Sequence, residues 1–272
     1  MSNATIRHFF LIAAIVSAVG ASARAATAPA GGKAQYDHCL ARASSNANEA
    51  LREAEEWQKA GGGPASDHCM AVALVALHRY GEAGVKLDAL ARGGFATDPT
   101  MRTALFDQAG NAWLLANKPD SAIASFSAAL AIDPSDAALL SDRARASAMK
   151  KSWARAESDL SAALLVDPAR ADLLVLRGSA RHAMGRKADA RADYERALKL
   201  RPGYVDALVE RGAMKFEAGD TVGARADWNQ VVSTSPNSAA ADVARQHLAD
   251  TEAAAPAPAN NGAVVLKPPK PH

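Results

Sequence analysis

Two cysteines carry the most reactive side chains of this 272-residue chain. Cys39 and Cys69 are its only cysteines, and each ends an Asp-His-Cys triplet. Such a pair can form a disulfide, remain as two free thiols, or bind a metal ion together with the adjacent His38 and His68. Neighbouring residues on a helix point about 100° apart, so the histidine and cysteine of one triplet cannot easily converge on one ion. We therefore expect a disulfide rather than a metal site.

Sequence patterns that support catalysis are otherwise missing. The chain has no glycine-rich phosphate loop, no Gly-x-Ser-x-Gly motif and no two histidines at metal-binding spacing on one helix. His78, His182 and His247 stand alone in the sequence, and each is interpreted as a surface or packing residue. We therefore expect no enzymatic activity, no cofactor and no bound metal.

A repeated pattern organises the middle of the chain. Four prolines follow one another at equal spacing: Pro134, Pro168, Pro202 and Pro236. They define four frames of equal length with the proline at position 32 of each, which are 103–136, 137–170, 171–204 and 205–238. In each frame, positions 4, 7, 8 and 11 fall on one helical face, and positions 20, 24 and 27 fall on another. The pattern predicts a hairpin of two helices in every frame.

Position 15 of each frame is expected to form the turn between the two helices. It holds Asn117, Lys151, Gly185 and Gly219. Asparagine and glycine suit the left-handed backbone conformation that ends a helix, whereas Lys151 does not. The proline at position 32 ends the second helix, because its ring excludes the helical conformation for the preceding residue.

The frames resemble the tetratricopeptide repeat. The residues of the first frame that carry the resemblance are Phe106, Ala109, Gly110, Trp113, Ala122, Phe126, Ala129 and Pro134. The later frames keep the second half of the motif best, for example Ala190, Tyr194, Ala197 and Pro202. The resemblance implies an all-α fold, an α-α superhelix or solenoid, because a single hairpin cannot bury enough surface to stand alone.

An unusual arginine and an aspartate vary together across the frames. Position 7 holds Ala109, Arg143, Arg177 and Arg211, and position 23 holds Ser125, Asp159, Asp193 and Asp227. We expect each arginine to form a partly buried ion pair with the aspartate of its own frame, which would bridge the two helices of one hairpin. The alternatives are solvated surface charges, worth roughly 0–1 kcal/mol, and pairing of each aspartate with the arginine of the next frame.

Residues 1–25 are typical of a secretory signal peptide. Arg7 and His8 precede an apolar run from Phe9 to Val19, and small residues follow up to Ala25. A run of this length is too short to span a bilayer, so we expect no stable membrane anchor after cleavage, and a permanent anchor is the alternative. Cleavage after Ala25 would leave 29 basic and 29 acidic residues. We therefore expect a periplasmic protein that does not bind nucleic acid.

The remaining segments are expected to flank the four repeats. Residues 26–35 are interpreted as a flexible linker, and residues 36–97 as two degenerate hairpins, the second with Gly81 at its turn. The region 98–238 contains the four repeats, residues 239–252 a capping helix, and residues 253–272 a disordered, Ala/Pro-rich tail. In an exported chain the two hairpins would place Cys39 and Cys69 at equal positions on stacked first helices, which favours their disulfide.

The resemblance also implies a binding surface. In tetratricopeptide proteins the first helices line a concave groove, into which positions 2, 5, 9 and 12 point. Carried over to this sequence, the polar or large residues at those positions are Asp107, Asn111, Ser141, Arg145, Asp172, Ser179, His182, Asp206 and Phe216. The lysine and asparagine clamp that some family members use for a terminal carboxylate is missing, which puts that ligand mode in doubt.

Two functions fit these expectations. The first is a periplasmic scaffold that binds a protein or an extended peptide in its concave groove. The second is a structural assembly factor of an envelope complex, which would use its convex face or its ends. Charge reversal at Arg145 and Asp172 would separate them, because only the first requires the groove.

Overall fold

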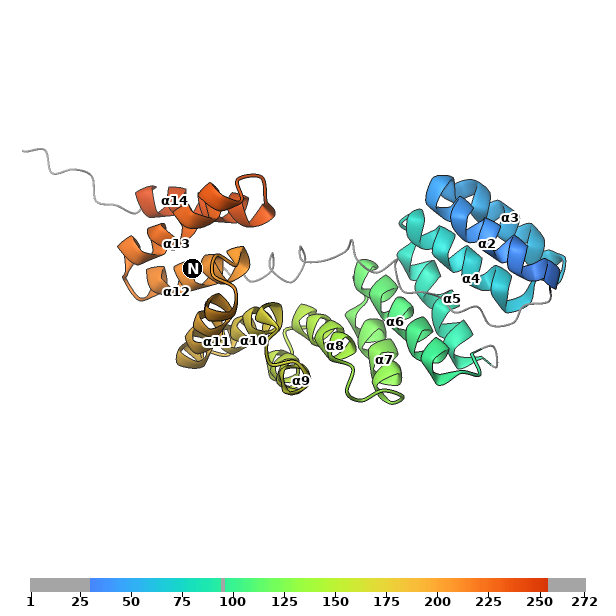
Figure 1. The fold of residues 1–272 in the computed structure, drawn as a ribbon, viewed down its shortest axis with the longest axis horizontal. Coiled ribbons are helices and arrows are strands. Elements are labelled where there is room, and N and C mark those ends of the chain that lie inside the picture. The colour runs from blue at the N-terminus through green and yellow to red at the C-terminus, as the bar shows by residue number, and fades with distance from the viewer. Residues whose placement is uncertain (1–29, 94–95, 254–272) are drawn as a thin grey trace, which may run out of the picture. The chain divides into compact units, whose positions relative to one another are not determined.

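The computed structural model describes residues 30–93 and 96–253. The expected signal peptide, the first residues of the expected linker and the tail from residue 254 lie outside this part of the chain. Within it there are thirteen α-helices and no strand, which confirms the all-α prediction. The helices, labelled as in Figure 1, are α2 (Ala30–Ser45), α3 (Ala47–Lys59), α4 (Gly63–Ala76), α5 (Tyr80–Arg92), α6 (Pro99–Leu115), α7 (Pro119–Leu130), α8 (Ala137–Met149), α9 (Trp153–Val166), α10 (Ala171–Ala183), α11 (Lys187–Leu200), α12 (Val205–Glu217), α13 (Thr221–Thr234) and α14 (Ala239–Ala253).

The described helices form two compact units, and each is described by itself. The first unit runs to Pro202 and holds α2 to α11 as five successive hairpins, in which each helix packs against the next (Figure 1). The second unit starts at Gly203 and holds the hairpin of α12 and α13, with α14 packed against both helices. The predicted stacking of neighbouring hairpins is therefore present throughout the first unit.

The frames of the repeat predict where three of the helices begin. Helices α8, α10 and α12 begin at residues 137, 171 and 205, which are the first positions of their frames. Helix α14 covers the expected capping helix and buries Ala241 and Ala244. Its His247 stacks on Trp228 of α13 with ring centroids 4.8 Å apart, so the cap is packed on the last repeat.

All four turn residues at position 15 are left-handed. Their φ angles are 55° for Asn117, 58° for Lys151, 79° for Gly185 and 86° for Gly219. Lys151 adopts this conformation although it does not suit it. The hydrogen bonds that end α8, from Lys151 N to Ala148 O and from Ser152 N to Ser147 O, hold it there at a conformational cost.

Two expectations about the N-terminal hairpins are corrected. Helix α2 begins at Ala30, inside the stretch expected to be linker. Once a helix has formed, each further residue adds a hydrogen bond, and Lys33 and Asp37 form an ion pair one turn apart. The second hairpin turns at His78, whose φ is 59°, and Gly81 already lies inside α5. His78 is position 15 of a frame that starts at residue 64, so this turn follows the same rule as the others.

Within the described residues, none of the helices combines the length and the apolar character needed to cross a membrane.

Candidate functional site

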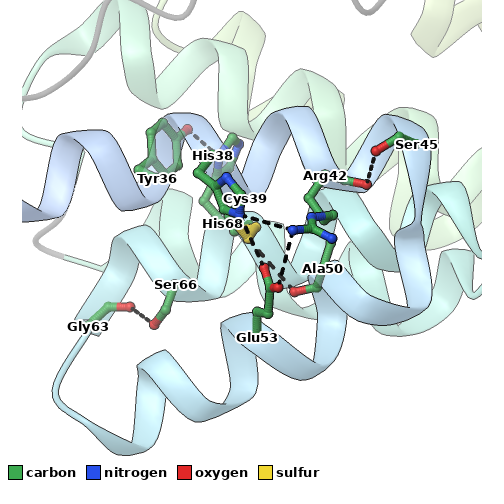
Figure 2. Close-up of a disulfide and its surroundings, with 11 residues drawn as sticks. Tyr36, His38, Cys39, Arg42, Ser45, Ala50, Glu53, Gly63, Ser66 and His68 are labelled. Carbon is green, nitrogen blue, oxygen red and sulfur yellow. Dashed lines mark hydrogen bonds and ion pairs between the residues drawn. A yellow bond between two sulfur atoms is a disulfide. The ribbon is translucent and has the colours of Figure 1, made fainter.

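A disulfide joins Cys39 of α2 to Cys69 of α4 (Figure 2), with 6.1 Å between their Cα atoms. These are the first helices of two neighbouring hairpins, so the predicted staple is confirmed. Both cysteines are buried, and among the described residues there is no free cysteine. The bond joins positions separated by 30 in the sequence, for which the chain-entropy estimate is roughly 3–4 kcal/mol of stabilisation.

His68 links three successive first helices. Its Nδ1 lies 2.6 Å from the Tyr36 hydroxyl of α2, and its Nε2 lies 3.1 Å from Gln108 Oε1 of α6. The hydroxyl of Tyr36 donates to the ring, and the ring N–H donates to the amide oxygen. Burial lowers the pKa of His68, against the opposing effect of the Gln108 hydrogen bond, and burial together with the charge of Asp37 raises the pKa of Tyr36 to about 12. Both groups therefore stay neutral at pH 7.

A hollow of about 400 Å³ lies beside the disulfide, and Figure 2 shows part of its wall. It is lined by Gln35, His38, Cys39, Glu53, Glu56, Trp57 and Ala60. Glu53 lies 3.8 Å from Arg42, and Glu56 lies 2.8 Å from Arg52, so both carboxylates have cationic partners. The described residues contain no cluster of three or more histidine, cysteine or acidic side chains that could hold a metal ion.

The three arginine–aspartate pairs lie within their own frames, as predicted. Arg143 holds Asp159 through two hydrogen bonds of 2.9 and 2.7 Å. Arg177 holds Asp193 at 3.0 and 2.7 Å. In the second unit, Arg211 holds Asp227 at 2.9 and 2.7 Å. Each bidentate contact joins the two helices of one hairpin.

Two further cations at position 11 were missed. Arg181 lies 2.8 Å from Asp193, and Lys215 lies 2.9 Å from Asp227, so each of these aspartates receives two cations. Position 11 lies one helical turn after the arginine at position 7, and this spacing could have revealed both partners.

The arginines at position 7 in the first unit also contact the preceding hairpin. Arg143 donates to Ser127 of α7 at 3.2 Å, and Arg177 donates to Ser161 of α9 at 3.4 Å. In the first unit these side chains therefore hold one hairpin together and tie it to its neighbour. Their role is structural, because both charges of each pair are engaged within the fold.

A polar cluster on α6 and α8 is the best candidate for ligand binding. It consists of Asp107, Asn111, Asp142 and Arg145, and is called the α6–α8 cluster below. The Asn111 amide donates to Asp107 Oδ1 at 2.9 Å, and Arg145 donates to Asp142 at 2.8 Å. Asn111 also acts to lower the pKa of Asp142. The cluster contains two carboxylates and one guanidinium, and each helix contributes one carboxylate.

Electrostatics leave Asp107 poised between its charged and neutral forms. Burial raises the pKa of Asp107 to about 7, and the negative charges of Asp142 and Asp136 add to the shift, while the Asn111 hydrogen bond opposes it. Burial also raises the pKa of Asp142, against the opposing effect of Arg145. The cluster therefore exchanges a proton near neutral pH, and a bound cationic or hydrogen-bond-donating group would favour the charged form of Asp107.

The comparisons with known proteins agree with this repeat geometry. The model of the tetratricopeptide repeat matches residues 171–204, which are the third predicted frame. The chain belongs to the tetratricopeptide repeat family. No curated protein matches the chain.

Several solved tetratricopeptide structures are similar to parts of it. The crystal structure of MamA shares 15% identity, covers 66% of this chain and 97% of its own, and has a TM-score of 0.54. A thermophilic repeat protein of Thermus thermophilus shares 18% identity, with 70% and 100% coverage and a TM-score of 0.53. The second repeat domain of human RPAP3, solved in complex with an HSP70 peptide, shares 30% identity, with 43% and 98% coverage and a TM-score of 0.42.

Only some groove positions of this tetratricopeptide repeat protein lie together. Asp107, Asn111 and Arg145 meet in the α6–α8 cluster, and sequence reasoning missed their partner Asp142. Asp142 is at position 6 of its frame, and this position is not among those that the family resemblance directs into the groove.

Two predicted groove serines are buried, which corrects their assignment as lining residues. Ser141 and Ser179 are 8% and 5% exposed. The Ser179 hydroxyl donates to Val175 O at 3.0 Å and lies 3.3 Å from the Tyr194 hydroxyl. The short side chain of Ser179 therefore turns back to its own helix and to the packed second helix.

The other predicted groove residues are not members of the α6–α8 cluster. Asp172 pairs with Arg170 at 2.6 Å, and this contact lowers the pKa of Asp172 although burial opposes the change. His182 is half-buried on α10. Asp206 and Phe216 belong to the second unit, where the Phe216 ring lies 6.0 Å from that of Trp228.

Proposed function

We propose that this tetratricopeptide repeat protein is a periplasmic scaffold, not an enzyme, that binds an extended segment of a partner protein across the first helices of its first unit. The α6–α8 cluster is the centre of this site. The proposal assigns binding to the face that the family resemblance identifies as concave, and export to the N-terminal segment expected to be a signal peptide.

The observation that carries the proposal is the meeting of Asp107, Asn111 and Arg145. These residues occupy positions that the family resemblance directs into the groove, and they form one half-buried polar cluster with Asp142. In the structural ion pairs of this fold, one carboxylate is neutralised by cations, as Asp193 is by Arg177 and Arg181. The cluster instead has more carboxylates than cations, and the pKa of Asp107 is raised to about 7, a shift of the kind that is common at functional sites.

The chemistry of the cluster suits a peptide. A peptide in an extended conformation offers backbone N–H donors and carbonyl acceptors along one edge. Carboxylates and the Asn111 Oδ1 can accept from such donors, while the Arg145 guanidinium can donate to carbonyls. A ligand that places an N–H group or a cation beside Asp107 would replace the proton that this carboxyl otherwise carries.

The competing function is a structural assembly factor that binds by its convex face or its ends. The two functions differ in which charges they require. Arg145 and Asp172 lie on first helices, whereas Arg155 is exposed on α9, a second helix. Charge reversal at the first two should affect only a partner bound at the first-helix face.

A crosslinked pull-down from native cell envelopes tests the proposal. The chain from Ala26 onward is used as bait, with Arg145→Glu, Asp172→Lys and the control Arg155→Glu, each checked for an unchanged circular dichroism spectrum. We expect the partner to be captured by the parent chain and by the control, and capture to fall at least about tenfold with Arg145→Glu. Equal capture by all variants would reject the first-helix face, and loss only with Arg155→Glu would support the assembly role.

A further inference from the structure

We propose that the C-terminal ends of α9 and α11 form a docking edge for an anionic lipid surface. The residues of this edge, called the basic apolar edge below, are Leu165, Val166, Arg196, Lys199, Leu200 and Arg201. The proposed peptide site does not use them, because they belong to second helices and the turns that follow.

Exposed apolar side chains are concentrated at this edge. Leu165 is 87% exposed, Val166 is 53% exposed, and Leu200 is 42% exposed. They are three of the five large apolar residues that are exposed among the described residues, and the other two, Val85 and Val222, lie on α5 and α13. Val166 and Leu200 occupy the same position in successive frames. The repeat therefore presents apolar groups at equivalent helix ends.

A hydrogen bond brings the two helix ends together. Arg196 of α11 donates to the carbonyl oxygen of Pro168 at 2.9 Å. Pro168 follows the last residue of α9 by two positions, and Arg196 lies one helical turn before Leu200. Apolar residues from both helices thus border the same short stretch of surface.

Positive charge lies beside the apolar residues at the end of α11. Between residues 150 and 201, only Asp189 and Glu195 are exposed carboxylates. The exposed cations at the end of α11 and in the turn that follows are Arg196, Lys199 and Arg201. Exposed cations therefore outnumber exposed carboxylates here even where an ion pair forms, as between Arg191 and Glu195.

Lipid fits this combination better than an acidic protein does. An apolar side chain as exposed as Leu165 projects outward, so a protein partner would need a recess to receive it, whereas a membrane interface accommodates projecting apolar groups wherever they meet it. The flanking cations can contact lipid phosphates while their aliphatic stems follow the apolar groups inward. A few apolar residues with a basic surface give reversible binding, which is compatible with the lack of a spanning helix among the described residues.

Vesicle co-sedimentation tests the proposal. The chain from Ala26 onward contains every described residue and lacks the apolar N-terminal run, which could bind vesicles by itself. It is mixed with vesicles of phosphatidylglycerol or of phosphatidylcholine. We expect binding to phosphatidylglycerol, at least about tenfold weaker binding to phosphatidylcholine, and loss of the phosphatidylglycerol affinity at high salt.

Matched variants distinguish binding through this edge from nonspecific binding to vesicles. Leu165→Ser and Lys199→Glu should each weaken binding to phosphatidylglycerol by about fivefold or more. Val222→Ser removes an apolar residue that is 83% exposed on α13, and Lys59→Glu reverses a cation in the last turn of α3, and neither should change the affinity. Equal loss with the controls, or no binding to phosphatidylglycerol, would overturn the proposal. Sedimentation velocity tests whether a second copy of this chain occupies the edge instead. A dimer that is abolished by Leu165→Ser, without vesicle binding, would assign the edge to that second copy and reject lipid.

Discussion

Tyr194 fills the space that Gly178 leaves open: a Cβ atom at residue 178 would lie 2.5 Å from Cε1 of the Tyr194 ring. The same relationship joins Gly110 to Phe126, also at 2.5 Å, and Gly212 to Trp228 at 2.4 Å. In the second frame, position 8 is instead Ala144 and position 24 is Leu160. Glycine therefore accompanies an aromatic residue, and alanine accompanies the smaller leucine, so the two helices of each hairpin are matched in volume.

Substitution of Gly178 by alanine should destabilise the protein although alanine favours helices. Overpacking costs about 1–3 kcal/mol, which exceeds the gain of roughly 1 kcal/mol in helix propensity. We expect the free energy of unfolding in urea to fall by about 1–2 kcal/mol. Tyr194→Leu should be less harmful in the Gly178→Ala background than in the parent chain, because the pair then resembles Ala144 and Leu160. Additive effects of the two changes would contradict volume matching.

Loss of the Asp193 carboxylate should be among the most damaging single changes in the first unit. The side chain is 5% exposed and neutralises Arg177 and Arg181 at 2.7 and 2.8 Å. Asp193→Asn keeps the shape but leaves Arg177 without a counter-charge, so we expect a loss of about 3 kcal/mol in urea unfolding. Arg181 keeps its second partner, Glu157, at 2.8 Å. Asp189→Asn is the control, because Asp189 is half exposed in its pair with Arg186 and should cost less than about 1 kcal/mol. Equal small effects would show that the buried pair contributes little.

Relief of the strained turn at Lys151 should stabilise the protein. Its φ of 58° is one that glycine adopts at no steric cost, as Gly185 does at the equivalent turn. We expect Lys151→Gly to raise the free energy of unfolding by about 1 kcal/mol. The control is Lys150→Gly, since Lys150 at the end of α8 has a negative φ of −84°, and there glycine should not stabilise the protein. Thermal unfolding followed by circular dichroism measures both variants, and a lower midpoint for Lys151→Gly would count against strain.

The extent to which sequence anticipated the structure depends on how strongly a feature repeats. The helix starts at residues 137, 171 and 205 and the pairing of Arg143 with Asp159 recur in successive frames, so each frame supports the others. Asp142 occurs in one frame only, and its contact with Asn111 depends on how α6 and α8 pack. The link from Tyr36 through His68 to Gln108 joins three helices without a periodic signal.

Burial and charge state were the least predictable features. Ser179 was expected to face the groove, but whether a short hydroxyl faces solvent or its own helix depends on neighbouring side chains such as Tyr194. The pKa of Asp107 depends on burial and on Asp142 and Asp136, and these effects are not visible from residue types along one helix. Lys151 shows the converse, because helix-ending hydrogen bonds impose a conformation that the residue itself disfavours.

Asp107 should make stability depend on pH in a definite direction. Its folded-state pKa of about 7 lies above its ordinary value of 3.8, so the folded protein binds the proton more tightly than the unfolded chain. This stability is fully present below about pH 3.8 and is lost as the pH rises to about 7. Asparagine stays neutral at every pH, so Asp107→Asn should remove this pH dependence. At pH 8 it also removes the cost of the buried charge, which should raise the free energy of unfolding by up to about 4 kcal/mol. The exposed Asp120→Asn is the control, and an unchanged difference between parent and Asp107→Asn from pH 4 to 8 would contradict the assignment.

Site-specific photocrosslinking in living cells tests the central claim most directly. A photoreactive residue replaces Ala138, which is exposed on α8 one helical turn before Asp142, or Ala154, which is exposed on the second helix α9. The account predicts that the Ala138 position crosslinks a partner protein, that mass spectrometry finds one short segment of it attached, and that Arg145→Glu abolishes the adduct. Crosslinks from Ala154 alone, or from Ala138 regardless of Arg145, would contradict binding at the α6–α8 cluster.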